Sequence, residues 1–301
     1  MYKLNGINLA TYNFIPTKQS GSDLALSGFL DMPSRTGKCF HNWPGQHGVE
    51  PYTSVNEIRF GGRDLSLFGH IVASSREQAV ERLANLYSAI DGFGGLVPLA
   101  TDCGSFQVYV KEAIVGEYKA EGILKVTIPF REPIVQLWGI MPPATVNNDY
   151  GIDGIAWSTM GVVLIGIEGD RYNRAQSKGA DITAYAKEGW SIGKTGESKL
   201  ILKLFLKQPT YQTFLAAIGN LYSIWSQPGE RNLITTDDVH RRVFACEGFS
   251  VTDIRNDDGW YGMVEMPLIE SQLSGVATYL GDNQGNYITD NLNNKILLKW
   301  Q

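Results

Sequence analysis

Cysteine and histidine side chains that could bind a metal occur together in one stretch of the chain. Cys39, His41 and His47 lie in this stretch, and a short cluster of this kind can hold zinc through sulfur and imidazole nitrogen. Their spacing matches no standard zinc motif, no second pair of ligands follows, and Pro44 intervenes. The sequence therefore predicts neither a metal site nor a bound cofactor.

Carboxylate and histidine side chains elsewhere offer little for acid–base or nucleophilic catalysis. Asp102 and Asp237 each follow a predicted strand at equivalent places in different halves of the chain, where aspartate commonly bonds its own backbone in a turn. His70 and His240 fall in predicted strands without an identifiable serine or cysteine partner. We therefore predict no catalytic residue, and a hydrolytic hypothesis rests only on the two loop histidines and scattered carboxylates.

A glycine-rich segment, Gly-Phe-Gly-Gly at 92–95, looks like a fragment of a phosphate-binding loop. It follows a predicted helix and precedes a predicted strand. A phosphate-binding loop has the reverse order, because it must aim a helix N-terminus at the phosphate. We interpret the segment as a turn.

Two aromatic side chains, Trp43 and Tyr52, stand in a loop rich in proline and glycine at 31–54. Large amphipathic rings can anchor a protein interface or stack on a sugar, and they also pack locally. We interpret these two residues first as an interface, second as local packing and third as a sugar site.

The elements that position these residues occur twice, because the stretch at 74–102 reappears at 209–237 when 135 is added to each position. Asn-Leu-Tyr-Ser at 85–88 recurs at 220–223, and apolar residues in both copies follow one face of a helix. Glycine follows each helix, as a chain leaving a helix usually requires. The sequence predicts a capping box at 74–77 and no such box in the second copy.

Predicted strands surround each helix and extend the repeat in both directions. Gly-Ile at 6–7 recurs at 154–155, at the larger offset of 148. The first copy therefore carries extra residues before its helix, and the loop at 31–54 is the natural place for them. We interpret this loop either as an arm that reaches a neighbouring subunit or as a loop folded against its own domain, with equal weight, because long loops in compact domains tend to be functional or partner-binding.

The sequence therefore predicts an α+β, mostly β protein with two tandem domains. We place the first domain at 1–135, a linker at 136–148, the second domain at 149–270, and a short C-terminal β extension at 271–301. Each domain has one flanking amphipathic helix.

Composition narrows the class of protein. The chain is 43% hydrophobic and 19% charged, with a net charge of −5, which suits a folded protein and disfavours a dedicated nucleic-acid binder. The three cysteines are odd in number and widely spaced, so no disulfide framework is predicted. The first residues lack a signal-peptide pattern and no apolar run is long enough to cross a bilayer, so we expect no secretion and no membrane insertion.

The order of these elements resembles the tube-forming domain of tailed-phage proteins, in particular distal tail and baseplate-hub proteins. The segments FGHIVASSREQAVERLANLYSAIDGFGGLVPL and FQVYVKEAIVGEY of the first copy carry the resemblance to the distal tail type, and it covers both copies. The resemblance implies β-sandwich-like domains whose sheets join those of neighbours in a ring with a central channel. Two domains in one chain favour a trimer with pseudo-six-fold symmetry, with a hexamer as the other arrangement.

The resemblance further implies a structural role without catalysis, in the tail tip of a phage or prophage virion assembled in the bacterial host cytoplasm. Partners would be other copies of the chain, tail-tube proteins and baseplate proteins, while DNA passes through the channel without specific binding. An acidic chain suits that passage. The alternative hypothesis is a non-catalytic carbohydrate-binding or adhesin-type module, based on the tryptophans and the aromatic loop.

Overall fold

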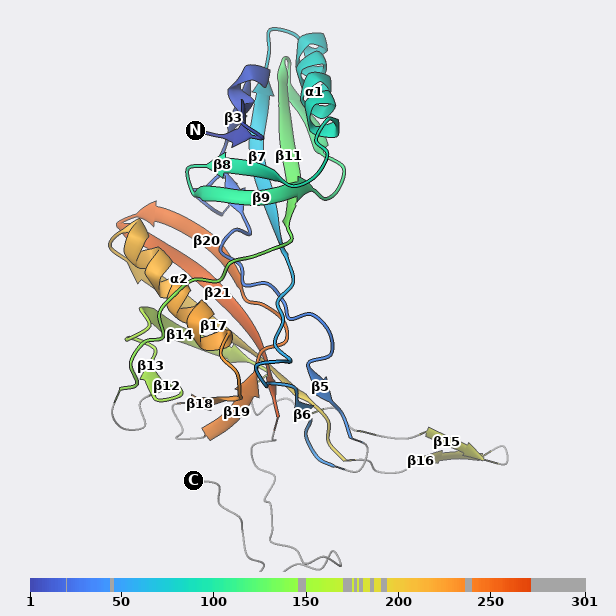
Figure 1. The fold of residues 1–301 in the computed structure, drawn as a ribbon, viewed down its shortest axis with the longest axis vertical. Coiled ribbons are helices and arrows are strands. Elements are labelled where there is room, and N and C mark those ends of the chain that lie inside the picture. Colours follow the sequence, from blue (N-terminus) through green and yellow to red (C-terminus); the bar gives the residue numbers. More distant parts are fainter. Residues whose placement is uncertain are drawn as a thin grey trace, which may run out of the picture.

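Two curled sheets, each with one helix against it, make up the computed structural model (Figure 1). The structure describes residues 1–19, 21–43, 46–145, 150–169, 175, 178, 181–184, 187–190, 194–235 and 240–271. The predicted α+β, mostly β fold class is confirmed. The predicted domain boundaries stay predictions, and most of the C-terminal extension (272–301) and the end of the linker (146–148) lie outside the described residues.

The N-terminal unit contains the first sheet and the first helix. Its elements are β1 (Lys3–Leu4), β2 (Ile7–Asn8), the short 3-10 helix η1 (Leu9–Tyr12), β3 (Phe14–Pro16), β4 (Leu26–Ser27), β5 (Phe40–His41), β6 (Glu50–Pro51), β7 (Arg63–Val72), α1 (Arg76–Asp91), β8 (Val97–Thr101), β9 (Gly104–Val110), β10 (Val115–Ala120) and β11 (Ile123–Glu132).

The C-terminal unit contains the second sheet and the second helix. Its elements are β12 (Gly151–Ile152), β13 (Ile155–Ala156), β14 (Val162–Glu168), β15 (Asp181–Ala184), β16 (Lys187–Trp190), β17 (Ser198–Gln208), α2 (Tyr211–Trp225), β18 (Arg231–Ile234), β19 (His240–Phe244), β20 (Ser250–Asp257) and β21 (Gly259–Glu270). The pair β15–β16 projects away from both units (Figure 1).

The two sheets share one strand order. The first runs β2-β1-β8-β9-β11-β7-β3 and the second runs β13-β12-β18-β19-β21-β17-β14, with β10 added to β11 and β20 added to β21. The first sheet has one further strand, β4, which pairs with β7. Each sheet curls, so that β8 and β9 cross β7 and β11 in the first unit (Figure 1). The repeat in the sequence is therefore also a repeat of topology.

Strict alternation along the long strands builds the cores. In β11 every second residue is buried, and in β17 Leu200, Leu202, Leu204 and Leu206 are fully buried. Such alternation places one face of a strand on the core. One continuous cluster of buried apolar side chains runs through both units, so the units share a core at their junction.

The two helices differ in burial although both contain the run Asn-Leu-Tyr-Ser, and α1 carries five charged residues where α2 carries none. Three residues of α1 are buried and nine of α2 are. The chain between the units lies across α2, where the Trp138 ring packs on Tyr222 with centroids 4.7 Å apart and Gly139 approaches Gly219 closely. The outer face of α1 has no such cover among the described residues, and Val80 is 51% exposed.

The helix caps differ from the sequence prediction. Helix α1 begins after Ser75, whose side chain accepts a hydrogen bond from Gln78 N, so the predicted box at 74–77 is wrong by one residue. Helix α2 begins after Thr210, which forms a capping box with Thr213. Threonine takes the place of the glutamate or glutamine usual at this position, which is why the pattern was not recognised.

Each unit buries one arginine–glutamate pair at the end of its long strands. Arg63 Nε lies 2.6 Å from Glu132 Oε2, and Arg241 Nη2 lies 3.2 Å from Glu270 Oε2. In register, Glu132 faces Arg63 on β7 but Glu270 faces Ser198 on β17. The arginine has therefore moved to another strand while the ion pair is retained.

Candidate interaction surface

The residues considered for zinc binding do not come together. Cys39 is buried in a small apolar cluster beside Cys246. The His41 ring lies against Trp43, with centroids 4.0 Å apart, and His47 Nδ1 lies 2.7 Å from Thr195 Oγ1. Within the described residues no group of three or more His, Cys, Asp or Glu side chains could hold a metal.

The residues considered for catalysis lie apart as well. Asp102 is exposed and forms an ion pair with the N-terminal amine of Met1. His70 is half-buried on β7, opposite Lys125 of β11. Asp237 and the side chain of His240 lie outside the described residues. The segment at 92–95 is a turn between α1 and β8, as predicted.

The loop at 31–54, here called the strap, crosses from the N-terminal unit onto the C-terminal unit of the same chain. Met32 N donates to Phe249 O at 2.9 Å and Arg35 N donates to Cys246 O at 2.8 Å. Further along, Val49 N donates to Ser271 O at 3.1 Å. Figure 1 shows β5 and β6 of the strap beside the second sheet. In this chain the strap therefore joins the two units and does not fold against its own domain alone. The prediction that it reaches a neighbouring subunit stays a prediction.

Trp43 and Tyr52 both belong to the strap. Trp43 is 45% exposed, and its Nε1 donates to Glu50 Oε2 at 2.5 Å. Tyr52 is half-buried, its amide donates to Cys39 O at 2.7 Å, and its carbonyl accepts from the Arg35 guanidinium. The interface role predicted for the two rings stays a prediction.

A glycine allows the strap to approach the second sheet closely. A Cβ atom placed on Gly248 would lie 1.5 Å from Met32 O, which is a backbone atom. No other residue fits there without moving the strap. No motif or periodic pattern in the sequence singles out Gly248. The one sequence feature that points to it is a difference between the two copies, because the equivalent position of the first copy holds Ala113.

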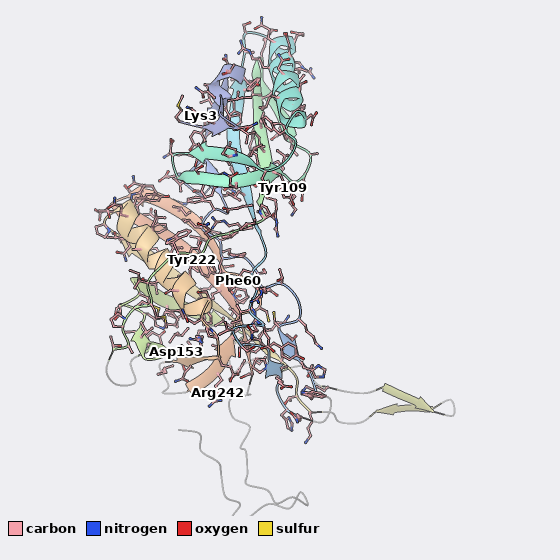
Figure 2. The ribbon with its side chains drawn as sticks, viewed as in Figure 1. Lys3, Phe60, Tyr109, Asp153, Tyr222 and Arg242 are labelled. Carbon is pink, nitrogen blue, oxygen red and sulfur yellow. The ribbon has the colours of Figure 1, made fainter. Side chains whose placement is uncertain are left out.

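A buried polar network ties the start of the strap to α2. Tyr222 Oη donates to Leu30 O at 2.5 Å and lies 3.5 Å from Arg63 Nη1, and Figure 2 shows Tyr222 at the junction of the units. Burial raises the pKa of Tyr222. Burial also raises the pKa of Asp31 to about 6. The hydrogen bond from Val251 N to Asp31 Oδ1, at 2.8 Å, opposes this shift.

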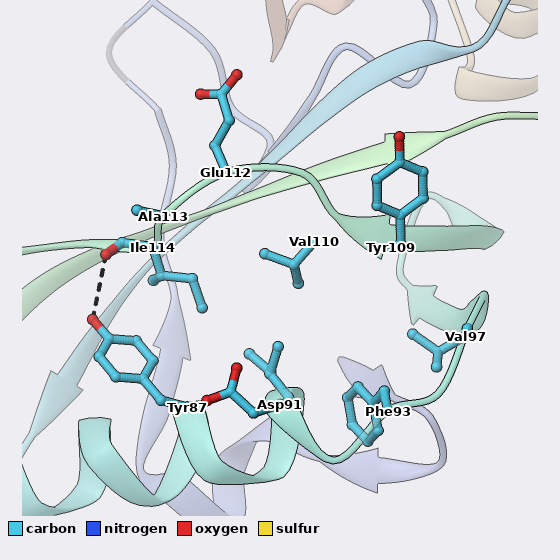
Figure 3. A pocket seen from close by; sticks show the side chains of 11 residues that line it. Tyr87, Asp91, Phe93, Val97, Tyr109, Val110, Glu112, Ala113 and Ile114 are labelled. Atoms are coloured by element: carbon cyan, nitrogen blue, oxygen red, sulfur yellow. Dashed lines mark hydrogen bonds between the residues drawn. The ribbon is translucent and has the colours of Figure 1, made fainter.

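The N-terminal unit carries an open cavity of about 570 Å³ between the end of α1 and the β9–β10 connection (Figure 3). Its lining is mainly apolar, and Asp91 and Glu112 are its two acidic residues. Tyr87 Oη donates to Ile114 O at 3.4 Å on one wall. The remaining lining residues are Ile90, Phe93, Gly95, Val97, Tyr109, Val110 and Ala113.

Comparisons with known proteins identify no family. No protein-family model and no curated protein matches the chain. Among solved structures, the chain is similar to the crystal structure of the SPP1 Dit (gp 19.1) protein, described as a paradigm of the hub adsorption apparatus in phages that infect Gram-positive bacteria. The similarity covers 90% of this chain and 98% of that chain, at 10% identity and a TM-score of 0.34. Neither fold nor function follows from a TM-score this low.

No helix in the described part of the chain combines the length and the apolar character that crossing a membrane requires.

Proposed function

We propose that this protein is a structural component of a phage or prophage tail tip, of the distal tail or hub type, and that it assembles with itself into a ring around a central channel. The observation that carries the proposal is the duplicated unit, in which one strand order occurs twice in one chain. The resemblance noted in the sequence supports the same role.

The contact between the two units is of the kind that builds rings. The strap of one unit meets the α2 and β19–β20 region of the other, so the two surfaces in contact differ. A contact between two different surfaces, repeated from chain to chain, closes into a ring or grows into a filament. Three chains would supply six units, which favours the trimer over the hexamer.

Exposed strand edges support assembly as well. Strand β14 ends the path of the second sheet and exposes Val163 and Ile165 by 58% and 55%. Strand β10 is exposed along its whole length, including Val115 and Tyr118. Free edges with apolar side chains tend to pair with other chains. We propose other copies, tail-tube proteins and baseplate proteins as partners, with DNA passing through the channel without specific binding.

The first test is the absolute mass of the purified protein by light scattering over a range of concentrations, followed by negative-stain images. We expect a trimer or a hexamer that appears as a ring with a central hole. A monomer at all concentrations, also in the presence of tail-tube protein, would contradict the proposal.

A carbohydrate-binding or adhesin-type module is the second candidate, because Trp43 presents a ring that is 45% exposed and lies against His41. Glycan-array binding that is lost in Trp43→Ala would favour this candidate. A chain that assembles but binds no glycan would remove it.

A further inference from the structure

We propose that the open cavity of the N-terminal unit is the docking site for a second copy of this chain. This inference rests on the proposed function, because it assigns a surface to the contact between chains. Its basis is the internal repeat, which provides a second, occupied version of the same site within the molecule.

Residues around the cavity have counterparts in the C-terminal unit at the offset of 135. Tyr87, Val110, Ala113 and Ile114 correspond to Tyr222, Ala245, Gly248 and Phe249. Strand pairing keeps the correspondence, since Gly116 faces Val126 in the first sheet and Val251 faces Val264 in the second. The cavity and this second surface are therefore the same site in two copies.

In the C-terminal unit the site is filled by the chain from Leu30 to Arg35. Leu30 O accepts the Tyr222 hydroxyl, Met32 N donates to Phe249 O, and Arg35 Nη1 donates to Ala245 O at 3.4 Å. Strap contacts thus lie on both walls, the helix and the β19–β20 connection.

In the N-terminal unit the matching groups lack an equivalent strap. The Tyr87 hydroxyl donates to Ile114 O of its own unit, whereas the Tyr222 hydroxyl donates to Leu30 O, just before the strap. Tyr109 at the rim is 42% exposed, and no described segment crosses the space between α1 and the β9–β10 connection. The site that the strap region covers in the C-terminal unit is therefore open in the N-terminal unit.

The repeat also indicates which partner fits. The strap lies in the connection from β3 to β7, and the equivalent connection in the C-terminal unit joins β14 to β17. The head-to-tail contact, from the connection of one unit to the helix side of the next, is used once within the chain. A second use of the same contact joins the N-terminal unit to another copy.

One difference limits how closely the two contacts agree. Ala113 carries a methyl group where Gly248 carries none, and a Cβ at Gly248 would collide with Met32 O. The incoming chain therefore lies farther from β9–β10 than the strap lies from β19–β20. The position of the contact repeats, while its atomic details differ.

The test compares the mass of three variants with that of the unaltered chain by light scattering over a concentration series. Ala113→Trp fills the cavity from an exposed position, and Glu112→Lys reverses a charge beside it. Ser158→Trp, in an exposed turn of the C-terminal unit, is the matched control. Thermal unfolding and circular dichroism verify that each variant is folded.

We expect both cavity variants to raise the concentration for half-association at least about tenfold, the effect of a disrupted interface centre, while Ser158→Trp leaves it unchanged. Folded cavity variants that assemble like the unaltered chain would overturn the inference and leave the proposed function standing. If the unaltered chain forms open filaments and Ala113→Trp does not, the result would support the inference and contradict the proposed ring. A monomeric unaltered chain would overturn both.

Discussion

Tyr87 and Tyr222 are the same amino acid at equivalent positions, yet their surroundings differ. Tyr222 is fully buried between the units and its hydroxyl donates to Leu30 O at 2.5 Å, whereas Tyr87 is half-buried with a 3.4 Å bond to Ile114 O. A hydroxyl contributes most where its removal leaves a buried partner without a hydrogen bond. The repeat thus supplies a matched pair for measuring what the junction contributes.

Tyr222→Phe should lower the free energy of unfolding by about 1–3 kcal/mol, because the buried Leu30 carbonyl loses its donor. Tyr87→Phe should change it by less than about 0.5 kcal/mol, as expected near the surface. Urea denaturation of both variants measures the difference. Equal losses would mean that the Tyr222 hydroxyl adds nothing to the junction.

The stability of the junction should depend on pH through Asp31. Burial raises its pKa from 3.8 to about 6, so the folded chain holds the proton more tightly than the unfolded chain. The contribution of Asp31 to the free energy of unfolding is therefore fully present below about pH 4 and is lost as the pH rises through about 6. A shift of this size corresponds to at most about 3 kcal/mol.

Asp31→Asn should remove this fall in stability between pH 4 and pH 7.5, since the amide oxygen can still accept from Val251 N and carries no charge. Asp23→Asn is the control. The pKa of Asp23 is lowered, mainly by the hydrogen bond that its carboxylate accepts from Asn256 N and then by Lys18. Its replacement should therefore leave the fall in stability between pH 4 and pH 7.5 in place. Thermal melts over a pH series measure both. If the stability of Asp31→Asn still falls between pH 4 and pH 7.5, another group causes the fall.

At the scale of elements, backbone hydrogen bonds hold the strap to the β19–β20 connection, at Cys246 and Phe249, and to Ser271 just after β21. Its close approach depends on Gly248, whose missing side chain leaves room for Met32 O. Cys39 of the strap and Cys246 of the second unit are free thiols in one apolar cluster, and burial together with the nearby Cys39 raises the pKa of Cys246. The strap therefore behaves as part of the C-terminal core although it belongs to the N-terminal connection.

Gly248→Ala should displace the strap and lower the free energy of unfolding by about 1–3 kcal/mol, the usual cost of an overpacked contact. Limited proteolysis should then cut the strap faster. Ala113→Gly, the reverse change at the equivalent exposed position, should cost less than about 1 kcal/mol and leave the strap protected. An intact strap in Gly248→Ala would contradict the close contact.

At the scale of the whole molecule, the shared apolar cluster should make the two units unfold together. Tryptophan fluorescence reports mainly on the C-terminal unit through Trp157, Trp225 and Trp260, because the first sheet contains no tryptophan. Far-ultraviolet circular dichroism reports on both units. The two transitions in urea should coincide, and in Gly248→Ala they should separate. Separate transitions in the unaltered chain would show that the junction is weak.

Local patterns in the sequence were enough to predict the fold class, the two helices and the long strands. Alternation in β7 and β17 and helical periodicity in α1 and α2 are read from neighbouring residues. The short pairings were less predictable. Residues 56–60 contain a turn and one isolated bridge from Phe60 to Arg35, and a pairing of this kind depends on a distant partner.

The sequence by itself determined that a mostly β unit with one helix occurs twice, because periodicity and repetition survive in the order of residues. Only the tertiary structure decided that the strap lies on the second unit, that Tyr222 is buried while Tyr87 is not, and that one copy of the site is filled while the other is open. The physical reason is that burial depends on which distant segment covers a surface, and identical letters in the two copies carry no information about that segment.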